Sequence, residues 1–246
     1  MPAKHTRHES TYGPGAVGES IWVLRGIDEA QKRAPKEDDW WVGIKAMPLE
    51  SPVGFPLDLW DRPIFKPERT TSFCSGATYA ALLLGMQKQR PINPGLTKDA
   101  EESLRQTEAD GSRRNDQIGF WGVWNGYGAG LYWALTDLTG AGVRVKPKDF
   151  RPGDFVQIYW TPKTGHSTIF LGWHQNAKGE RFMRIWSSQQ GTKGLGDWNV
   201  PVKRLFGLVG VRLTDSIRVL SAPVGTFPRT GPDGDKAPEE GWPALP

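Results

Sequence analysis

The sequence is poor in cysteine, and Cys74 is the only one in 246 residues. A single thiol excludes an internal disulfide and any zinc site built from several cysteines. Long apolar runs are also missing, because no stretch approaches the ~18 apolar residues that a membrane-spanning helix needs. We therefore expect no transmembrane segment, while a hydrophobic content of 37% is enough to fill the core of a globular domain.

Clustered positive charge is missing as well. The formal net charge is +4, but the basic residues are scattered in short groups such as Lys32-Arg33, Lys88 to Arg90 and Arg113-Arg114. Nucleic-acid-binding proteins usually carry a basic stripe or patch. We therefore expect no nucleic-acid partner, and the residual charge predicts only weak attraction to anionic surfaces.

The composition divides the chain into three parts. Residues 1–20 are polar and contain glycine and proline, which predicts an N-terminal arm that either wraps the domain or stays loose. Residues 222–246 carry six prolines and few apolar residues, which is typical of an extended or disordered tail. Residues 21–221 contain no internal repeat, so we expect one domain there.

Hydrophobic spacing predicts helices first and strands afterwards. The helices are expected over Phe73 to Gln87, from Thr97 to Gly111, and over Leu131 to Leu138 before Gly140. The strands are expected over Asp154 to Trp160, Ser167 to Trp173, Arg181 to Ser188 and Leu208 to Leu213. This order indicates an α+β fold in which helices pack on a small antiparallel β-sheet.

Aromatic residues are plentiful, with twelve tryptophans in the chain. Several fall together in Phe120-Trp121-Gly122-Val123-Trp124-Asn125-Gly126-Tyr127-Gly128. Such a segment suits an aromatic surface that stacks on sugar rings or apolar ligands. It suits the core equally well, because tryptophan is highly buried on average. The sequence leaves both interpretations open.

The surroundings of Cys74 suggest a reactive thiol. A helix that begins near Ser72 would place Cys74 in its first turn, where free N–H groups and the helix dipole stabilise a thiolate. The usual alternative is an inert packing residue, because free cysteine behaves as a small hydrophobe. The polar neighbours Thr71 and Ser72 and the small neighbours Ser75 and Gly76 leave room for a substrate, which favours the reactive interpretation.

His166 is the candidate base, and a β-hairpin predicts its partner. If Ala177 and Lys178 form the centre of the turn, His166 lies opposite Gln189. A shift of one residue in the turn would place Ser187 or Gly191 there instead. Gln189, with Ser187 as the alternative, could therefore bind one ring nitrogen and fix the tautomer, as the third member of a catalytic triad does.

The remaining histidines, His5, His8 and His174, lack the spaced partners of a zinc site. We therefore expect no metal and no cofactor.

These motifs resemble a known family. Cys74-Ser75-Gly76 at a helix start, Pro152-Gly153-Asp154 before a strand, and Gly165-His166-Ser167 within one are together similar to the NlpC/P60 branch of the papain-like cysteine peptidases, and to the related CHAP amidases. The resemblance covers about residues 70–190. It implies a papain-like core with Cys74 as nucleophile, His166 as base and then acid, and Gln189 as the orienting residue, where NlpC/P60 members often carry histidine.

The same resemblance gives the other motif residues a role. Gly153 and Asp154 would form a structural turn, and the long interval between Cys74 and His166 would contain an insertion around residues 88–130. The implied activity is that of a cysteine amidase or endopeptidase acting on peptidoglycan or its stem peptides, through an acyl-thioester intermediate. Two other functions stay open: a thiol acyltransferase or lipid-handling enzyme on the same fold, and a non-catalytic, tryptophan-rich module that binds glycan or protein.

The start of the chain, Met1 to Ser10, lacks the apolar core of a signal peptide. We therefore expect synthesis in the cytoplasm, and delivery to the periplasm or the exterior by a secretion system or by phage-type lysis. A wall-degrading toxin delivered in this way would be accompanied by an immunity protein.

Overall fold

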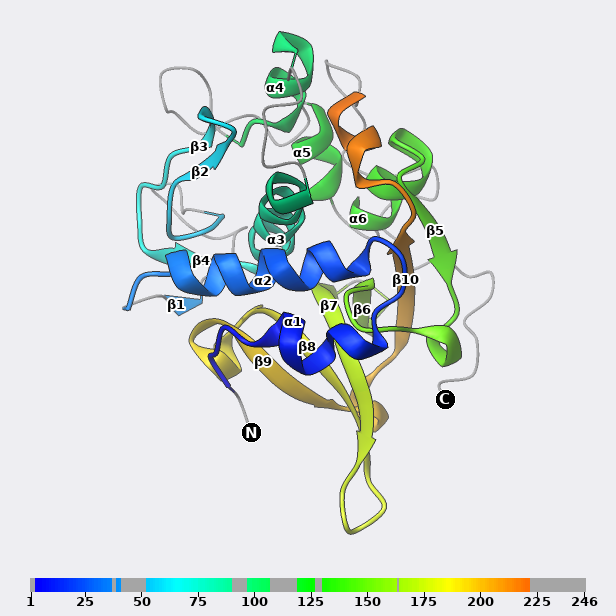
Figure 1. Ribbon diagram of the computed structural model, residues 1–246. Helices are drawn as coiled ribbons and strands as arrows, with labels where there is room; N and C mark the ends of the chain where they lie inside the picture. Colours follow the sequence, from blue (N-terminus) through cyan, green and yellow to red (C-terminus); the bar gives the residue numbers. More distant parts are fainter. Residues whose placement is uncertain are drawn as a thin grey trace.

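One buried helix, α3 (Cys74–Gln89), runs through the middle of the molecule (Figure 1). The computed structural model describes residues 3–36, 39–40, 52–89, 97–106, 119–126, 130–162 and 164–221. Every residue of α3 from Ser75 to Met86 is buried, as expected for a helix that is apolar on all sides. The helix predicted over Phe73 to Gln87 is therefore confirmed.

A second long helix, α2 (Ser20–Arg33), packs against α3 at very short range. A Cβ atom on Gly26 would lie 1.9 Å from the carbonyl oxygen of Ala81, and one on Gly85 would lie 2.5 Å from that of Trp22. Only glycine fits at these two crossing points. The buried residues Val23, Leu24, Ile27 and Ala30 follow helical spacing, although the sequence analysis assigned no helix to this segment.

The sheet has six strands in the order β5-β10-β6-β7-β8-β9, and all neighbours are antiparallel. Strands β6 to β9 form a meander, and β10 returns to the free edge of β6 before pairing with β5. The strands are β5 (Gly142–Val145), β6 (Phe155–Thr161), β7 (Thr164–Gln175), β8 (Arg181–Gln189), β9 (Gly194–Pro201) and β10 (Gly207–Leu213). The four predicted strands correspond to β6, β7, β8 and β10, so the coarse α+β prediction is confirmed, whereas β5 and β9 were not predicted.

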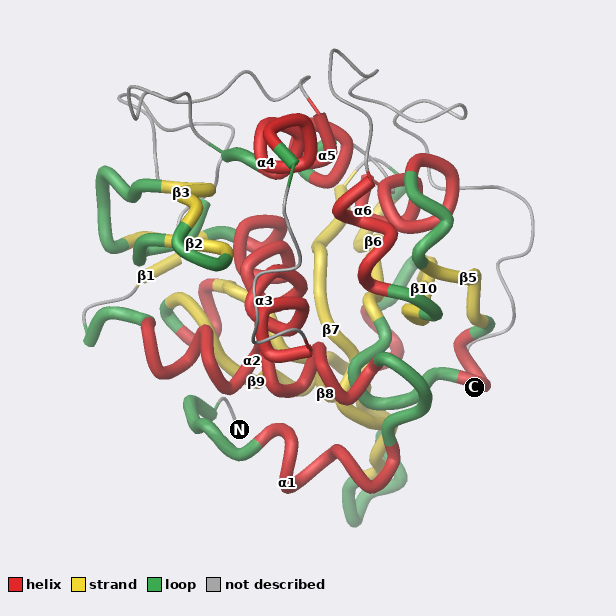
Figure 2. The backbone as a smooth tube through the Cα atoms, turned by 45° about the horizontal axis from the view of Figure 1, so that its top comes forward, coloured by secondary structure: helices red, strands yellow, loops and turns green. Residues whose placement is uncertain are grey.

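Both faces of the sheet are covered by apolar side chains. Along β7, Ile169 and Leu171 belong to the core shared with α2 and α3, while Phe170 belongs to a second core with Ile158 and Ile185. Alternate residues of a strand point to opposite faces. The helices therefore cover one face, as Figure 2 shows for α2 and α3 across the strands, and the second core lies on the other.

The smaller elements surround this frame. The helices are α1 (His8–Tyr12), α4 (Lys98–Leu104), α5 (Gly119–Trp124) and α6 (Gly130–Trp133), the last continuing as a π-helical turn over Ala134–Leu138. Two short pairs add β1 (Asp39–Trp40) with β4 (Thr71–Ser72) and β2 (Leu57–Leu59) with β3 (Arg62–Phe65). Among the helices of the described ranges, none is both long and apolar enough to cross a membrane.

Three expectations are corrected or refined here. Helix α4 begins after Thr97, whose side chain accepts a hydrogen bond from the N–H of Ala100 as a helix cap does, but it ends at Leu104 and not at Gly111. Residues 107–118 lie outside the described residues, as does the predicted tail over 222–246. The helix predicted before Gly140 is confirmed, although part of it is π-helical.

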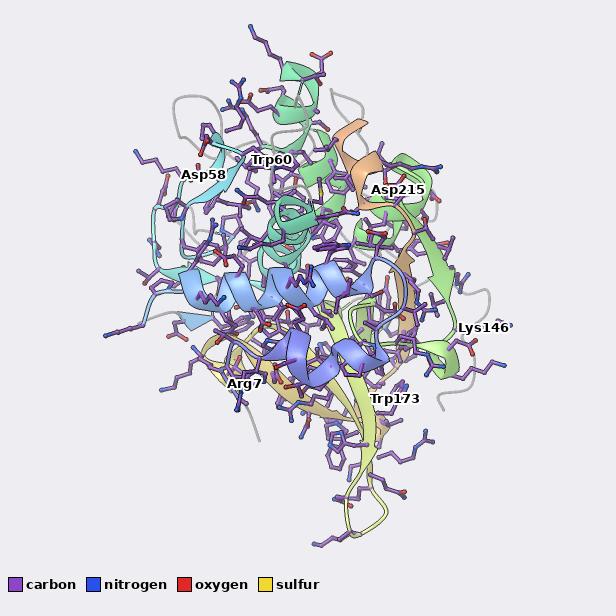
Figure 3. All side chains as sticks on the ribbon, in the orientation of Figure 1. Arg7, Asp58, Trp60, Lys146, Trp173 and Asp215 are labelled. Atoms are coloured by element: carbon purple, nitrogen blue, oxygen red, sulfur yellow. The ribbon has the colours of Figure 1, made fainter. Side chains whose placement is uncertain are left out.

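The aromatic segment around α5 is core. Phe120, Trp121 and Trp124 are at most 1% exposed, and the rings of all three lie within 6 Å of the Tyr79 ring on α3. The interpretation of these three residues as an exposed aromatic surface is therefore wrong. Most of the α3 side chains belong to the core, while the β7–β8 hairpin projects away from the body beyond Trp173 (Figure 3).

Candidate active site

Cys74 is the first residue of α3, and its side chain is half-buried. The backbone leading into the helix is fixed by a hydrogen bond from the N–H of Phe73 to the carbonyl oxygen of Pro52, at 3.1 Å. A Cβ atom on Gly76 would lie 1.9 Å from that same oxygen. The glycine of the Cys-Ser-Gly motif is thus required for the first turn of α3 to pack on Pro52, and this packing fixes where the thiol lies.

His166 lies on β7 and hydrogen-bonds the Cys74 thiol. Burial raises the pKa of that thiol, but the hydrogen bond and the charge interaction with His166, together with the N–H groups of Ser167 and Ser75, outweigh it and lower the pKa below its usual value. The structure therefore brings the predicted nucleophile and base together. A thiol with a lowered pKa beside an imidazole is the activated form that nucleophilic catalysis requires.

Gln189, at the end of β8, is the third member of the group. Its Oε1 atom lies 3.4 Å from Nε2 of His166. The Gln189 amide nitrogen donates to Oγ1 of Thr192 and to the carbonyl oxygen of Gly196, both at 2.8 Å. These two acceptors orient the carboxamide so that its oxygen faces His166. Because that oxygen can only accept, Nε2 carries the proton and Nδ1 is left to exchange one with the thiol.

The hairpin register explains why Gln189 and not Ser187 lies there. Ile169 pairs with Trp186 and Phe170 with Ile185, which is the register that places His166 opposite Gln189. Nearer the turn the pairing is shifted by one residue, and an irregularity at Leu171 restores it. Ser187 donates instead to the carbonyl oxygen of Ser167, at 2.6 Å.

A buried pair of serines joins the helix to the strand. Ser72, just before α3, lies with its Oγ 2.9 Å from Oγ of Ser188, and Ser188 donates to the carbonyl oxygen of Ser72 at 3.0 Å. Both side chains are fully buried. Since Ser188 precedes Gln189, this contact sets the separation between the thiol and the orienting residue. The sequence analysis did not identify it, because nothing in the chain shows that residues 116 apart meet.

The Pro-Gly-Asp turn has the structural role that was expected of it. Gly153 has φ +90°, a left-handed conformation that favours glycine. Asp154 is fully buried and accepts hydrogen bonds from the Arg151 N–H and from the guanidinium of Arg212. This turn anchors the start of β6 and takes no part in the group around Cys74.

A partly exposed aromatic group adjoins His166. The ring of Trp160 is stacked near that of His166, with centroids 6.2 Å apart and planes at 28°. The ring of Trp198 lies 6.4 Å from Trp160, and the guanidinium carbon of Arg204 lies 5.7 Å from the Trp160 ring. Sequence analysis missed these residues, because they come from three segments separated in the chain.

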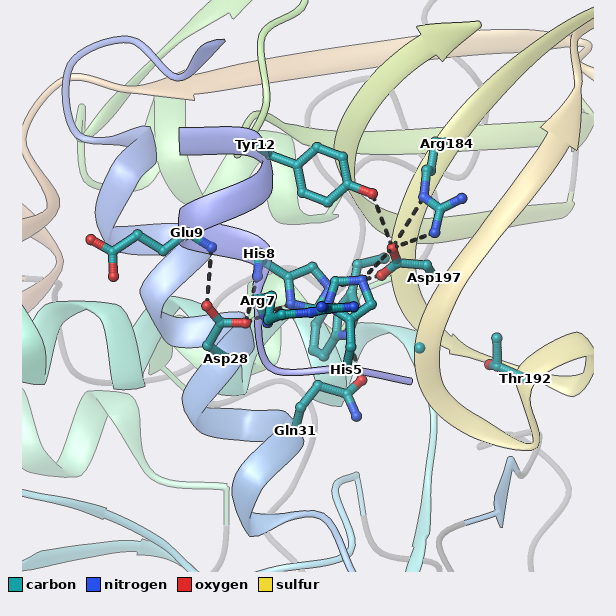
Figure 4. Close-up of polar contacts among 12 residues, drawn as sticks. His5, Arg7, His8, Glu9, Tyr12, Asp28, Gln31, Arg184, Thr192 and Asp197 are labelled. Carbon is teal, nitrogen blue, oxygen red and sulfur yellow. Dashed lines mark hydrogen bonds and ion pairs between the residues drawn. The ribbon is translucent and has the colours of Figure 1, made fainter. Parts of the chain in front are cut away.

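The structure also reveals a cluster of two histidines on the N-terminal arm, separate from the group around Cys74 (Figure 4). Ala3 pairs with Asp197 of β9, so the described part of the arm wraps the domain. His8 is fully buried, with Nδ1 and Nε2 each 2.7 Å from a carboxylate oxygen, of Asp28 and Asp197 respectively. Asp197 also accepts hydrogen bonds from Tyr12 and Arg184.

His5, His8 and Asp197 offer ligand atoms that lie within 4.8 Å of one another, so a metal ion is conceivable here. The hydrogen-bond pattern instead indicates that the ring nitrogens facing the carboxylates carry protons and do not bind a metal ion. Nδ1 of His5 accepts the N–H of Arg7 at 3.2 Å, so its Nε2 carries the proton that faces Asp197. Both nitrogens of His8 face carboxylates, and although burial lowers the pKa of His8, the bonds to Asp197 and Asp28 raise it overall. The groups of the cluster thus pair with one another as an ion-pair network. The sequence could not show this, because both aspartates lie outside the arm.

Comparison of the chain with protein-family models, with curated proteins and with solved structures finds no match. A functional assignment therefore depends on two things. The first is the geometry of the group formed by Cys74, His166 and Gln189, and the second is the motif resemblance in the sequence.

Proposed function

We propose that this protein is a cysteine hydrolase of the NlpC/P60 type that cleaves an amide bond of peptidoglycan. The observation that carries the proposal is the contact of a half-buried thiol at a helix start with an imidazole whose far nitrogen faces an oriented carboxamide. Each of these three groups would have one defined task in acyl transfer.

Cys74 would be the nucleophile. With its proton on His166, the thiolate attacks the carbonyl carbon of the scissile amide, and a C–S bond forms as the carbonyl oxygen gains negative charge. Backbone N–H groups in the first turn of α3, that of Cys74 first among them, would stabilise this oxyanion. The helix dipole acts in the same direction because its positive end faces the reacting carbonyl.

His166 would then act as the acid. It gives its Nδ1 proton to the leaving amine as the C–N bond breaks, which leaves a thioester on Cys74. A water molecule, deprotonated by the same nitrogen, attacks the thioester and restores the thiol. Gln189 accepts from Nε2 throughout, so it holds the ring in one tautomer and stabilises the imidazolium without being able to take its proton.

Peptidoglycan as the substrate is supported by the motif resemblance. An acyltransferase would form the same thioester and differ only in the final acceptor. The experiment must therefore identify both the bond that is broken and the group that receives the acyl chain.

We would digest purified peptidoglycan with the wild type and with Cys74→Ala, and analyse the soluble fragments by mass spectrometry. We expect fragments ending in a new carboxylate from the wild type only, with one oxygen from water when the digestion is done in H₂¹⁸O. Circular dichroism would establish that both proteins are folded. If both folded proteins release nothing, peptidoglycan hydrolysis is wrong. Release by Cys74→Ala would rule out the thiol mechanism.

A further inference from the structure

Next to His166 lies a surface that the chemical steps above do not use. Ile158 pairs with His166 between β6 and β7, and Trp160 packs against the same core as Ile158 with its ring stacked near that of His166. All three side chains therefore lie on one face of the sheet. Trp160 is partly exposed and packs against Trp198 at 6.4 Å, with the planes at 58°. The indole is therefore held in place by a second indole, and it presents a fixed aromatic surface beside the candidate base.

Arg204 extends this surface with a positive charge. Its guanidinium carbon lies 5.7 Å from the centre of the Trp160 ring, within the range of a cation–π contact. The residue is exposed. Within the described part of the chain, no carboxylate pairs with Arg204, whereas its neighbour Lys203 pairs with Glu180 at 3.3 Å. The fork of N–H donors on Arg204 is therefore available to a ligand.

The reaction indicates which part of a substrate reaches this surface. The acyl part becomes attached to Cys74, while the leaving amine must lie beside His166 to receive its proton. A chain that follows the leaving nitrogen past His166 on this side would meet Trp160, whose ring adjoins the imidazole. The distances of 6.2 and 5.7 Å keep the guanidinium within about 12 Å of the His166 ring, which is the reach of at most about four residues of extended chain at roughly 3.3–3.6 Å per residue.

We infer that Arg204 and Trp160 form a subsite for the leaving group, and that this subsite selects substrates whose leaving amine belongs to an amino acid or short peptide with a free carboxylate. The inference rests on the proposed function, since it assumes that His166 protonates the leaving amine. The carboxylate binds the guanidinium through paired N–H donors, and the aliphatic part of the leaving group lies on the indole. Neutral or amidated leaving groups would lose the charge contact.

The test compares two stem-peptide fragments that differ only in the leaving group, one ending in a carboxylate and the other in a carboxamide. We expect the wild type to favour the carboxylate by about tenfold in kcat/KM, mainly through KM, because an exposed charge-assisted contact is worth on the order of one decade in binding. Arg204→Gln should process both fragments with equal kcat/KM. Arg204→Lys should restore part of the preference, because lysine keeps the charge but not the fork.

Lys203→Gln is the matched control, because it removes an exposed positive charge from the neighbouring position and should keep the wild-type preference. The inference is overturned if Arg204→Gln keeps that preference, or if it lowers kcat equally on both fragments. If the wild type cleaves neither fragment, the proposed function fails separately, and calorimetry decides about the subsite. Binding of the carboxylate fragment that Arg204→Gln abolishes would support the subsite, and absence of binding to the wild type would overturn it.

Discussion

The two buried histidines of this protein, His8 and His166, have opposite surroundings. Both are less than 9% exposed, and each has a partner within hydrogen-bonding distance of Nε2. For His8 the partners of both nitrogens are carboxylates at 2.7 Å. For His166 one partner is a neutral carboxamide at 3.4 Å and the other is a thiol.

This difference fits a structural role for His8 and the catalytic role that we propose for His166. An imidazole between two buried carboxylates is held as a cation, because losing its proton would remove the positive charge that Asp28 and Asp197 share. It can join the arm to the domain but cannot pass protons easily. Neither partner of His166 is a carboxylate. Burial of a histidine therefore says nothing about its role, whereas the charge of its partners does.

The largest effect should follow from removing His166, to which the proposed mechanism assigns the proton transfers. His166→Ala should lower kcat/KM for amide hydrolysis by about a thousandfold or more, because both thiol activation and leaving-group protonation are lost. Steady-state kinetics on a stem-peptide fragment would measure it. His174→Ala is the control, since His174 is exposed on the β7–β8 hairpin. A His166→Ala variant with near wild-type turnover would remove His166 from the mechanism.

Removing His8 should lower the stability of the fold instead of the rate of hydrolysis. His8→Ala leaves Asp28 and Asp197 without the cation that they share, and should lower the free energy of unfolding by about 3–5 kcal/mol, the cost of breaking a buried ion pair. Urea unfolding would measure it, with His174→Ala expected to change the value by no more than about 0.5 kcal/mol. A loss below about 1 kcal/mol for His8→Ala would show that the arm is not held by this network.

The partner of His166 can be tested by comparing two residues of β8. Gln189→Ala should lower kcat by about tenfold to a hundredfold, because the ring loses its fixed tautomer while the thiol remains. Ser187→Ala should leave kcat nearly unchanged, since Ser187 bonds the backbone of Ser167 and not the imidazole. The opposite order of effects would indicate that Ser187, and not Gln189, is the third member of the triad.

A smaller effect should appear in the pH dependence of stability. The pKa of His8 is raised above 6.5 in the folded state by its two carboxylates, so its contribution is complete below pH 6.5 and is lost as the pH rises through the raised value. Urea unfolding at successive pH values should therefore show falling stability above pH 6.5 in the wild type, and a weaker fall in His8→Gln. Equal slopes in the two proteins would contradict a protonated His8.

Local pattern was enough to predict the frame of the site. The apolar run after Cys74 predicts α3, and the content of β-branched and aromatic residues predicts β6 to β8. The predicted register holds near His166, but the pairs next to the turn are shifted by one residue and the irregularity at Leu171 restores the register. Strand β9 escaped prediction because Gly194-Leu195-Gly196-Asp197 is poor in β-forming residues, and it forms by pairing with β8 along its whole length. A segment whose conformation depends on its neighbour cannot be recognised from its own composition.

The residues that complete the site escaped prediction for a similar reason. Gly196 supplies a backbone carbonyl to Gln189, and Ser72 meets Ser188 across 116 residues of chain. The arm cluster joins His8 to Asp197 across 189 residues. These contacts depend on tertiary packing, and a single sequence carries no local signal for them. The residues that we propose for the chemistry could be named from the sequence, whereas the groups that orient them could not.

The central claim is that Cys74 and His166 form an activated thiol–imidazole pair, and the rate of alkylation by iodoacetamide as a function of pH tests it most directly. Only the thiolate reacts, so the midpoint of the profile reports the pKa of Cys74. We predict a midpoint below the ordinary cysteine value of about 8.5 in the wild type, and a higher midpoint in His166→Ala, where only the N–H groups of Ser167 and Ser75 still oppose the effect of burial. A wild-type midpoint at or above that value, unchanged by His166→Ala, would contradict the account.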